Sequence, residues 1–496
     1  MEIIKSIVSW AEAISWGGVA GIWWLGTLIV VLVPAGLYFS IRLRFVQLRS
    51  FGHIWSLLFS GVKHDHDDGV SSFQAFATSA AARVGTGNIA GVAVAVSMGG
   101  PGAVFWMWVV AVVGMASSFV ENSLAQVYKV KTDEHNVYRG GPAYYIARGL
   151  GPRFRWLSTA FSFFLVLSFG LVFNTIQADS MTESVRVAFG FEPLIVGGVL
   201  TVLAVIIVAG GIRSIGRFAE VVVPVMALGY IGIALFVVLA NITEVPGVIA
   251  TIVKAAFGVE QLTAGGLGAV LANGLKRGLF SNEAGMGSSP NAAAAADVKH
   301  PAVQGFVQMG SVFLDTMLIC TATASVILLT DAGTAAIGSK PQGVALTQAA
   351  LTETVGSWGG SFIAIALLFF AFTSVIANYY YAESNVAYLF SRKVGVPVYR
   401  VLYAGFLMLG AWVASSEDDS QFELMWQMAD VSMGFMATCN LIAILLLTGT
   451  AAKVLEDYER QRRNGVESPT FNPEAVGIEG CDPGVWESDS PSPPPS

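Results

Sequence analysis

Charged residues are scarce in this chain. Only 12% of its 496 residues are Asp, Glu, Lys or Arg, whereas 54% are hydrophobic. A typical soluble domain carries about 25% charged residues. The net charge of −7 gives no basic surface of the kind that binds nucleic acid. This composition excludes an ordinary soluble protein, and the long apolar runs predict an all-α polytopic membrane protein that contacts a lipid bilayer and no nucleic acid.

The motifs of several enzyme classes are also missing. Three cysteines, two of them in apolar segments, provide no disulfide framework, and the five histidines are scattered. The sequence contains neither HExxH nor the phosphate-binding pattern GxxxxGK[ST], which argues against a metalloprotease and an ATP-driven pump. An ion channel needs a repeated filter sequence or a ring of charges, and the sequence shows no such filter. We therefore expect no enzyme activity and no cofactor.

Apolar runs of about 20 residues predict membrane-spanning helices. We identify eleven, at roughly 15–41, 73–98, 103–128, 157–184, 193–212, 217–241, 263–296, 303–330, 356–390, 397–415 and 421–452. No signal peptide is recognised before the first one, which is expected to remain as a helix. If the N-terminus lies outside, the inner loops hold 20 of the 27 Lys and Arg residues and the outer loops hold four. The positive-inside rule then predicts a protein of the plasma or inner membrane whose N-terminus lies outside and whose C-terminus lies in the cytoplasm.

Glycine interrupts two of the predicted helices. The first contains Gly85-Thr86-Gly87-Asn88, and the second contains GLFSNEAGMG at 278–287. Backbone that leaves a helix in lipid exposes polar groups at a cost of several kcal/mol each, so it is tolerated only where it lines a cavity or binds something. Glycine that merely permits close helix packing is the alternative, but it does not explain the polar side chains at both breaks. Two interrupted segments in corresponding positions predict a binding site between repeats.

The position of the breaks also predicts the domain organisation. After the first helix, ten spans divide into two sets of five with opposite topology. We expect an N-terminal helix and linker at 1–70, a first repeat at 71–241, an extracellular linker at 242–261, an inverted repeat at 262–452 and a cytoplasmic tail at 453–496. From 464 onward the tail has six acidic residues and no Lys or Arg, and it ends in SDSPSPPPS. That composition is typical of a disordered, solvated segment.

The ends of the broken helices predict a ligand. The half-helix that follows a break presents free N–H groups and a positive dipole end, which bind a carboxylate. The half that precedes it presents carbonyl oxygens, which suit an ammonium group or Na⁺. We expect Asn88 to cap the helix over 89–98, and Ser281 or Asn282 to cap the helix after the second break. A zwitterionic amino acid satisfies both kinds of end at once.

Four segments resemble the sodium:alanine symporter family, the alanine or glycine:cation symporters. They are GTGNIAGVA (85–93), GGPGAVFWMW (99–108), GLFSNEAGMGSSPNAAAAA (278–296) and FAFTSVIANYYYAE (370–383). The resemblance extends over about 15 to 480. It implies the leucine-transporter architecture, with five-plus-five inverted repeats and one extra helix, here the first.

The resemblance also implies a substrate site and a Na⁺ site. In this architecture, backbone amides at the first break hold the substrate carboxylate, and the matching positions are Thr86 and Gly87, with Asn88 nearby. Na⁺ binds carbonyl groups before that break and two hydroxyls on the eighth core helix. The matching ion ligands are Ala81, Val84, Thr373 and Ser374. The chemistry of the residues fits this, because adjacent hydroxyls in LLFFAFTSVIA supply oxygen ligands for Na⁺, but it is the match to the family pattern that favours an ion site. Hydroxyls that bond back to their own helix are the alternative.

Further polar residues complete the prediction. Gln177 resembles a family position that faces the substrate, with an interhelical hydrogen bond as the alternative. The other substrate-binding candidates are Phe280, Ser281, Asn282 and Asn378. Ionisable groups inside spans are functional hypotheses by default. The candidates for a second ion or a coupling network are Asp315, Thr316 and Glu283, and Lys276 and Arg277 are candidates to pair with Glu283.

These features together predict a secondary symporter. Na⁺ flows down its gradient and carries alanine or glycine into the cytoplasm by alternating access. A symporter for glutamine or another neutral amino acid, and coupling to H⁺ in place of Na⁺, stay open. The first break has no carboxylate, which favours Na⁺. An ion channel is the alternative from a different class. The oligomeric state, a monomer included, is left open by the sequence.

Overall fold

The computed structural model describes residue 8 and residues 27–61, 69–132, 137–258, 266–338, 343–390, 392–416 and 419–486. Within these ranges, seven helices are long and apolar enough to cross a membrane, and each overlaps a predicted span. They are Gly102–Val127, Pro152–Phe189, Gly211–Ala240, Pro301–Leu328, Trp358–Leu389, Arg392–Ser415 and Leu424–Leu446. Of the first predicted span, 15–41, the part at 15–26 lies outside the described residues.

The first half of the chain contains a broken helix and several longer ones. The broken helix comprises α5 (Ser72–Arg83), η1 (Gly87–Gly91) and α6 (Val92–Gly99). The elements before it are α2 (Thr27–Arg42), α3 (Val46–Arg49) and α4 (Phe51–Gly61). Those after it are α7 (Gly102–Val127), β1 (Val130–Lys131), β2 (Tyr138–Arg139), α8 (Pro142–Gly149), η2 (Pro152–Phe154), α9 (Arg155–Leu165), η3 (Val166–Val172), α10 (Phe173–Phe189), α11 (Pro193–Ala209), α12 (Gly211–Ala240) and α13 (Val245–Ala256).

The second half also begins with a broken helix, formed by α14 (Gly266–Asn282) and α15 (Pro290–Ala295). The following elements are α16 (Pro301–Val312), η4 (Phe313–Cys320), α17 (Thr321–Leu328), α18 (Asp331–Ala335), α19 (Val344–Val355), α20 (Trp358–Leu389), α21 (Arg392–Ser415), α22 (Asp419–Leu446), α23 (Thr448–Arg463), α24 (Pro473–Val476) and α25 (Pro483–Trp486). The last predicted span, 421–452, therefore ends early, because α22 stops at Leu446 and α23 is a separate helix.

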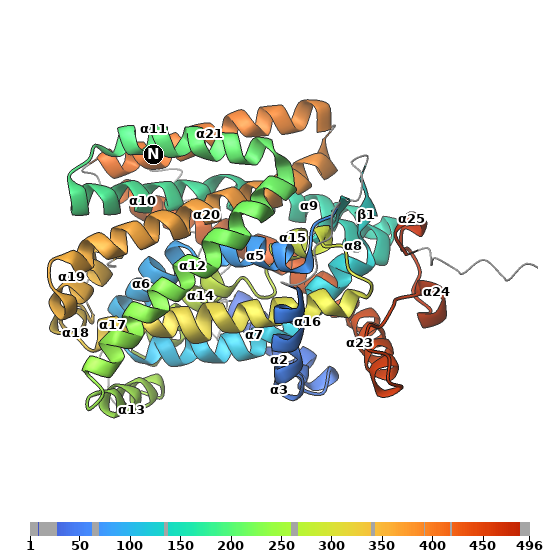
Figure 1. Ribbon diagram of the computed structural model, residues 1–496, viewed down its shortest axis with the longest axis horizontal. Coiled ribbons are helices and arrows are strands. Elements are labelled where there is room, and N and C mark those ends of the chain that lie inside the picture. The colour runs from blue at the N-terminus through green and yellow to red at the C-terminus, as the bar shows by residue number, and fades with distance from the viewer. Residues whose placement is uncertain are drawn as a thin grey trace, which may run out of the picture.

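The long helices form two groups with the first broken helix between them. In one group α7 packs against α14 and α16, and in the other α10 packs against α20 and α21. Figure 1 shows the first group in the lower part of the view and the second group, with α11, in the upper part. Helix α5 contacts both α16 and α20, so it touches both groups. This arrangement places the first break between two bodies of packed helices.

Both predicted breaks are present. At the first, α5 ends at Arg83 and Val84 leaves the helical region with ψ of 84°. Helical structure resumes at Gly87 as a π-helical turn. At the second, α14 continues through Asn282, and Glu283 has the left-handed φ of 56°. Unwinding at the second break therefore covers 283–289 rather than the whole of 278–287, because residues 278–282 still complete the last turns of α14.

The predicted helix caps are wrong. Asn88 lies inside η1, and neither η1 nor α6 has a side-chain cap. Helix α15 begins at Pro290 after Ser289, whose side chain makes no cap bond either. Ser281 and Asn282 belong to the end of α14 and cannot cap a helix that begins eight residues later. The polar side chains at the breaks bind other partners, described below.

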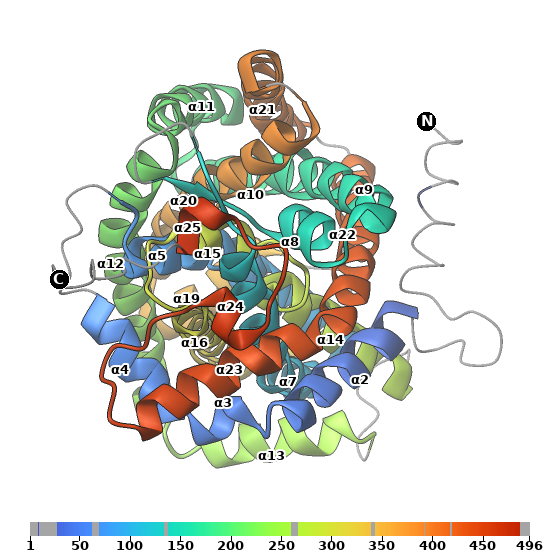
Figure 2. The same ribbon diagram turned by 90° about the vertical axis from the view of Figure 1, so that its right-hand side faces the viewer.

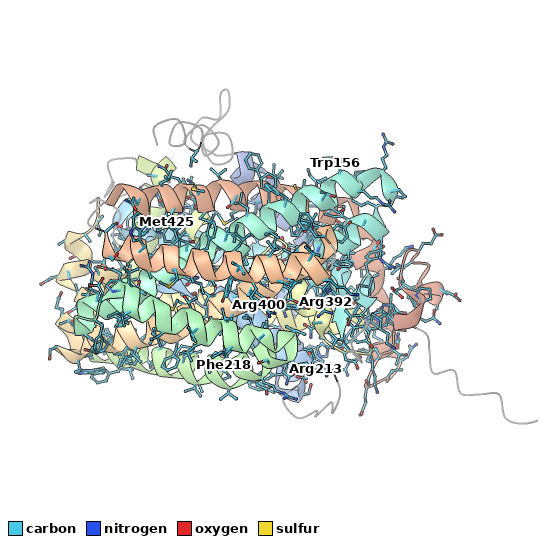
Figure 3. The ribbon with its side chains drawn as sticks, turned by 90° about the horizontal axis from the view of Figure 1, so that it is seen from above. Trp156, Arg213, Phe218, Arg392, Arg400 and Met425 are labelled. Carbon is cyan, nitrogen blue, oxygen red and sulfur yellow. The ribbon has the colours of Figure 1, made fainter. Side chains whose placement is uncertain are left out.

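The C-terminal segment is folded where the sequence predicts a solvated tail. Residues 464–486, here called the C-terminal arm, pack on the end of the molecule that carries α8, α15 and α23 (Figure 2). Its buried residues include Phe471 and Ile478. Residues 487–496 lie outside the described ranges. Figure 3 shows Arg213 and Arg392 displaced toward this same end of the bundle, so the arm shares an end with basic residues of the predicted inner loops.

Candidate functional site

The first break presents two backbone N–H groups to side-chain amides. Gly85 N donates to Asn88 Oδ1 at 3.0 Å, and Thr86 N donates to Gln177 Oε1 at 3.1 Å. Thr86, Asn88 and Gln177 are all buried. The unwound backbone released these donors from their helix, so a neutral carboxamide has taken the place of each helical carbonyl. Carboxamides hold such donors less strongly than a carboxylate would.

A hydroxyl and three carbonyl oxygens meet beside this break. Ser374 Oγ on α20 donates to Ala81 O at 2.8 Å and lies 3.4 Å from Val84 O. It also lies 2.9 Å from Phe370 O on its own helix. Thr373 Oγ1 instead donates to Phe370 O, at 2.9 Å. The structure thus brings Ser374, Ala81 and Val84 together, whereas the Thr373 hydroxyl bonds back to its own helix.

Gly85 is needed for this close approach. A Cβ at this position would lie 2.5 Å from Ser374 Oγ and 2.8 Å from Gln177 Nε2. Real Cβ atoms are essentially never found within 3.0 Å of a heavy atom. Glycine therefore allows α20 and α10 to bring polar groups against the backbone of the first break.

Asp315 links the two broken helices. Asn88 Nδ2 in η1 donates to Asp315 Oδ1 at 2.6 Å, and Ser281 Oγ at the end of α14 donates to Asp315 Oδ2 at 2.5 Å. Thr316 Oγ1 donates to the same carboxylate at 2.9 Å. All four residues are buried. The structure therefore joins Asp315 and Thr316 to two of the predicted substrate-binding residues.

At the second break, the backbone donors are held by a carboxylate. Glu121 on α7 accepts from Gly285 N at 3.2 Å and from Gly287 N at 3.1 Å. Asn440 Nδ2 on α22 donates to Glu121 Oε2 at 2.9 Å and to Gly285 O at 2.9 Å. As an ionisable group inside a predicted span, Glu121 is a functional hypothesis from the sequence, with a structural role as the alternative. A carboxylate in an apolar span was the signal for Glu121, whereas Asn440 carried no signal.

Glu283 is not joined to the other predicted coupling residues. Its carboxylate accepts from Ser288 Oγ at 2.6 Å, within the second break itself. Its expected pairing with Lys276 and Arg277 is wrong. Arg277 Nη2 lies 2.8 Å from Asp430 Oδ2, and Lys276 Nζ lies 3.7 Å from the same atom. Both basic residues precede Glu283 on α14 and are turned toward α22, which supplies their partner.

Aromatic rings cover the first break on the α14 side. Phe280 packs against Phe173 at 4.7 Å and against Trp426 at 5.0 Å between ring centroids. A Cβ on Gly87 would lie 3.0 Å from Phe280 Cδ1. Arg277 lies one turn before Phe280 on α14, and its guanidinium is 4.8 Å from the Trp426 ring. Phe280 therefore closes the space above Gly87.

Several buried polar atoms near the breaks are without a partner. Among the described residues, none lies within hydrogen-bond reach of Thr86 Oγ1, Asn282 Nδ2, Asn378 Oδ1, or the Nε and Nη2 atoms of Arg83. Asn378 Nδ2 does donate to Asn174 Oδ1, at 3.2 Å. Buried polar groups are almost always paired, and an exception needs an explanation. Donors and acceptors both occur in this group, which suits a ligand that carries both signs of charge.

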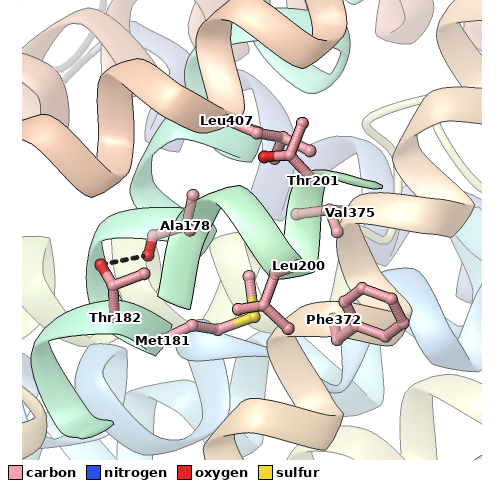
Figure 4. A pocket seen from close by; sticks show the side chains of 9 residues that line it. Ala178, Met181, Thr182, Leu200, Thr201, Phe372, Val375 and Leu407 are labelled. Atoms are coloured by element: carbon pink, nitrogen blue, oxygen red, sulfur yellow. Dashed lines mark hydrogen bonds between the residues drawn. The ribbon is translucent and has the colours of Figure 1, made fainter. Parts of the chain in front are cut away.

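Figure 4 shows a different pocket, among α10, α11, α20 and α21. Its lining is mostly apolar, and Thr182 Oγ1 there donates to Ala178 O at 2.9 Å. It contains none of the residues of either break. We therefore assign the candidate site to the polar centre between the two breaks and not to this pocket.

Comparisons with known proteins identify the family of this chain. Residues 3–473 match the model of the sodium:alanine symporter family. The chain is similar to the amino-acid carrier protein AlsT of Bacillus subtilis, with 48% identity over 93% of this chain and 95% of that protein. It is 46% identical to the probable sodium/glutamine symporter GlnT of the same organism, over 95% of this chain and 94% of that protein. It is 38% identical to the sodium/alanine symporter AgcS of Methanococcus maripaludis, over 89% of this chain and 96% of that protein.

Proposed function

Because the chain belongs to the sodium:alanine symporter family, it is a multi-pass membrane transporter and not an enzyme, and we propose that it carries alanine or glycine into the cell together with Na⁺. The observation that supports this most directly is the first break, where two exchangeable backbone donors, a carbonyl–hydroxyl cluster and unpaired buried polar atoms lie side by side. Such irregular backbone at membrane depth is typical of transporter binding sites.

The substrate carboxylate is proposed to bind the N–H groups of the first break. Those of Gly85 and Thr86 are now held by the carboxamides of Asn88 and Gln177. A carboxylate is the stronger acceptor, so it can displace a neutral amide oxygen from these donors. Thr86 Oγ1, which has no partner among the described residues, adds a third donor. Gln177 and Asn88 then turn to other partners or to the substrate itself.

The substrate ammonium group is proposed to lie near Asp315. The Asp315 carboxylate sits between the two broken helices and accepts from Asn88 and Ser281. An ammonium group or a second Na⁺ would find there an acidic side chain that is hydrogen-bonded to Asn88 at the first break and to Ser281 at the end of α14. Phe280 covers Gly87 so closely that a Cβ on Gly87 would lie 3.0 Å from its ring, and this restriction favours small substrates such as alanine and glycine.

The Na⁺ ion is proposed to bind Ala81 O, Val84 O and Ser374 Oγ. Hard cations prefer oxygen ligands, and carbonyl oxygens at the end of α5 carry the negative end of its dipole. Both carbonyl oxygens already lie within 3.4 Å of Ser374 Oγ, so little rearrangement is required. Thr373 completes the set when its side chain rotates away from Phe370 O. Ion and substrate then bind adjacent sections of one unwound segment, which couples their affinities.

The remaining architecture is part of this proposal. The two halves, 71–241 and 262–452, each begin with a broken helix, which supports an inverted repeat of the leucine-transporter type. The C-terminal arm lies at the end toward which Arg213 and Arg392 are displaced, which supports a cytoplasmic C-terminus and an outer N-terminus. Alternating access would move the α7–α14–α16 group against the α10–α20–α21 group around the site.

A glutamine symporter is the second candidate. One relative at 46% identity is described as a probable sodium/glutamine symporter. Asn378 and Asn174, which face each other near the site, supply carboxamides that can pair with a substrate carboxamide. The substrate would then need the space that Phe280 now closes.

Uptake by purified protein in proteoliposomes tests these alternatives. We expect an inward Na⁺ gradient to drive accumulation of radiolabelled alanine and glycine, and K⁺ in place of Na⁺ to abolish it. Serine and glutamine are run beside them, and a proton gradient without Na⁺ tests coupling to H⁺. Faster uptake of glutamine than of alanine would favour the second candidate. Equal uptake with K⁺ would refute Na⁺ coupling.

A further inference from the structure

The inner ends of the two broken helices are bonded to each other. Val70, just before α5, pairs with Ala296, just after α15, in an isolated parallel bridge. Asp297 N donates to Val70 O at 2.9 Å. These bonds join the beginning of one broken helix to the end of the other, on the face that carries the C-terminal arm. Any movement that separates α5 from α15 must break them.

A buried lysine secures this junction. Lys129 Nζ donates to Ala296 O at 2.8 Å and is fully enclosed. It lies 4.1 Å from the centre of the Tyr138 ring and 5.0 Å from that of Trp486, the last residue of α25. Trp486 Nε1 in turn donates to Val127 O at 3.2 Å. The C-terminal arm therefore forms one wall of the enclosure around Lys129.

The arm crosses the junction on its other side as well. Phe471 N donates to Lys299 O at 3.0 Å, and the Phe471 ring packs against His300 and Trp486. Lys299 and His300 belong to the short connection between α15 and α16. The Arg148 side chain of α8 donates to Asp482 at 3.1 Å. The arm thus covers the α15–α16 connection at Phe471 and the end of α7 at Trp486.

We propose that the C-terminal arm is a strap that holds the inner ends of the two broken helices closed, and that Lys129 is the positioning residue through which the strap acts on α15. This inference rests on the proposed function, because the closed junction matters only if substrate leaves between these helix ends. The strap favours the inward-closed state, since its contacts are made on the bonded junction. Opening toward the cytoplasm requires the arm to loosen or lift.

Cys481 provides a built-in probe of this movement. It lies in the arm between Asp482 and Gly480 and is partly buried, whereas Cys320 and Cys439 are buried among membrane helices. A membrane-impermeant maleimide applied to the cytoplasmic face should label Cys481 faster when the arm lifts. The labelled peptide is identified by mass spectrometry, so the other thiols do not confuse the result.

The test compares Trp486→Ala with Trp156→Ala. Trp156 is 65% exposed, so its replacement is a matched control that leaves the arm in place. Without substrate, we expect W486A to label several-fold faster than the wild type and W156A to label at the wild-type rate. In the wild type, Na⁺ together with alanine should raise the labelling rate, because each transport cycle passes through the open state. Equal rates for W486A and W156A would overturn the proposal.

Uptake kinetics supply a second readout. Removal of residues 464–496 should raise the KM for external Na⁺ several-fold with little loss of maximal rate, because a smaller share of the protein is then in the outward-facing state. Lys129→Met should do the same and Lys131→Met, an exposed neighbour, should not. An unchanged KM in the truncated protein would refute the strap. Failure of the wild type to transport alanine would instead refute the proposed function, and the substrate-free labelling difference would still decide on the strap.

Discussion

The Na⁺ site predicts that two adjacent hydroxyls contribute unequally. Ser374 Oγ lies 2.8 Å from Ala81 O and 3.4 Å from Val84 O, whereas the Thr373 hydroxyl is turned to Phe370 O of its own helix. In Ser374→Ala, Na⁺ loses a ligand that is already aimed at the site. In Thr373→Ala, it loses one that must first break an intrahelical hydrogen bond. We therefore expect the serine substitution to have the larger effect on Na⁺ affinity.

The magnitude follows from the energy of one charged contact. A hydrogen bond to a charged group contributes about 1.5–3 kcal/mol, and about 1.4 kcal/mol corresponds to a tenfold change in affinity. S374A should therefore raise the Na⁺ concentration for half-maximal alanine uptake by about 10- to 150-fold. For T373A, the cost of the broken Phe370 bond, about 0.5–1.5 kcal/mol, is subtracted, so the change should be several-fold smaller.

The assay is alanine uptake into proteoliposomes over a range of Na⁺ concentrations at constant ionic strength. Thermal unfolding in K⁺ buffer serves as the folding control, because it reports stability without the ion. Both variants should unfold within a few degrees of the wild type. Equal shifts for S374A and T373A would refute the argument from hydroxyl direction. An unchanged Na⁺ dependence in S374A would remove this ion site altogether.

Other contacts give further predictions. Gly85→Ala would place a methyl group 2.5 Å from a serine hydroxyl, whereas at Gly91 the nearest atom is 3.9 Å away; G85A should reduce alanine uptake tenfold or more and G91A should leave it nearly unchanged, in the same vesicles. Asp315→Asn removes the charge that links the two breaks, so alanine binding measured by calorimetry should weaken at least tenfold, and wild-type affinity would contradict the role of this carboxylate. Glu121→Gln turns an amide donor toward backbone N–H groups and should lower the free energy of unfolding by about 1–3 kcal/mol, as measured by denaturant titration. Burial lowers the pKa of His300 from 6.5 to about 4, so protonation favours states in which its ring is exposed. The contacts of His300 with the C-terminal arm should therefore weaken as the pH falls from 6.5 toward 4. At each pH the labelling rate of Cys481 is measured in the wild type and in H300Q, and the ratio of the wild-type rate to the H300Q rate should rise as the pH falls.

The positions of the breaks could be predicted because glycine and polar residues leave a local signal. Gly85 and Gly87 both face atoms that would collide with a Cβ, and those atoms belong to predicted site residues. Asp315 was identified for a related reason, since an ionisable side chain in an apolar span is costly unless it has a partner, whereas Ser374 was identified by its match to the family pattern. In each case the sequence itself shows which residue is energetically unfavourable in an apolar span.

The partners could not be predicted, because they are far apart in the chain. Arg277 and Asp430 are 153 residues apart, and Asn440 lies 319 residues from Glu121. The sequence around Arg277 does not show whether its partner is Asp430 or Glu283, which is nearer in the chain. The packing of α14 against its neighbouring helices determines which carboxylate Arg277 contacts. The caps failed for a different reason. Asn88 is a residue type that often caps helices, but the backbone N–H groups that the break leaves without helical acceptors precede it in the chain. Its side-chain oxygen accepts from Gly85 N, and its side-chain nitrogen donates to Asp315.

The C-terminal arm shows where composition misleads. Few apolar residues and a surplus of acidic ones predict disorder, because such a segment cannot bury enough surface by itself. Here the apolar surface is supplied by the folded body. Phe471 and Trp486 pack on His300, Lys129 and each other, so a small number of aromatic residues suffices to fix the arm.

The two breaks differ in what holds their backbone donors, and this difference assigns their roles. At the first, the acceptors are the neutral carboxamides of Asn88 and Gln177, which a substrate carboxylate can displace at little electrostatic cost. At the second, the acceptor is the Glu121 carboxylate, which would have to leave its donors while fully buried and would repel an incoming anion. A substrate carboxylate should therefore bind only at the first break, although both breaks present the same kind of backbone. The second break then acts as a fixed wall, and the exchange of ligand takes place where the resident acceptors carry no charge.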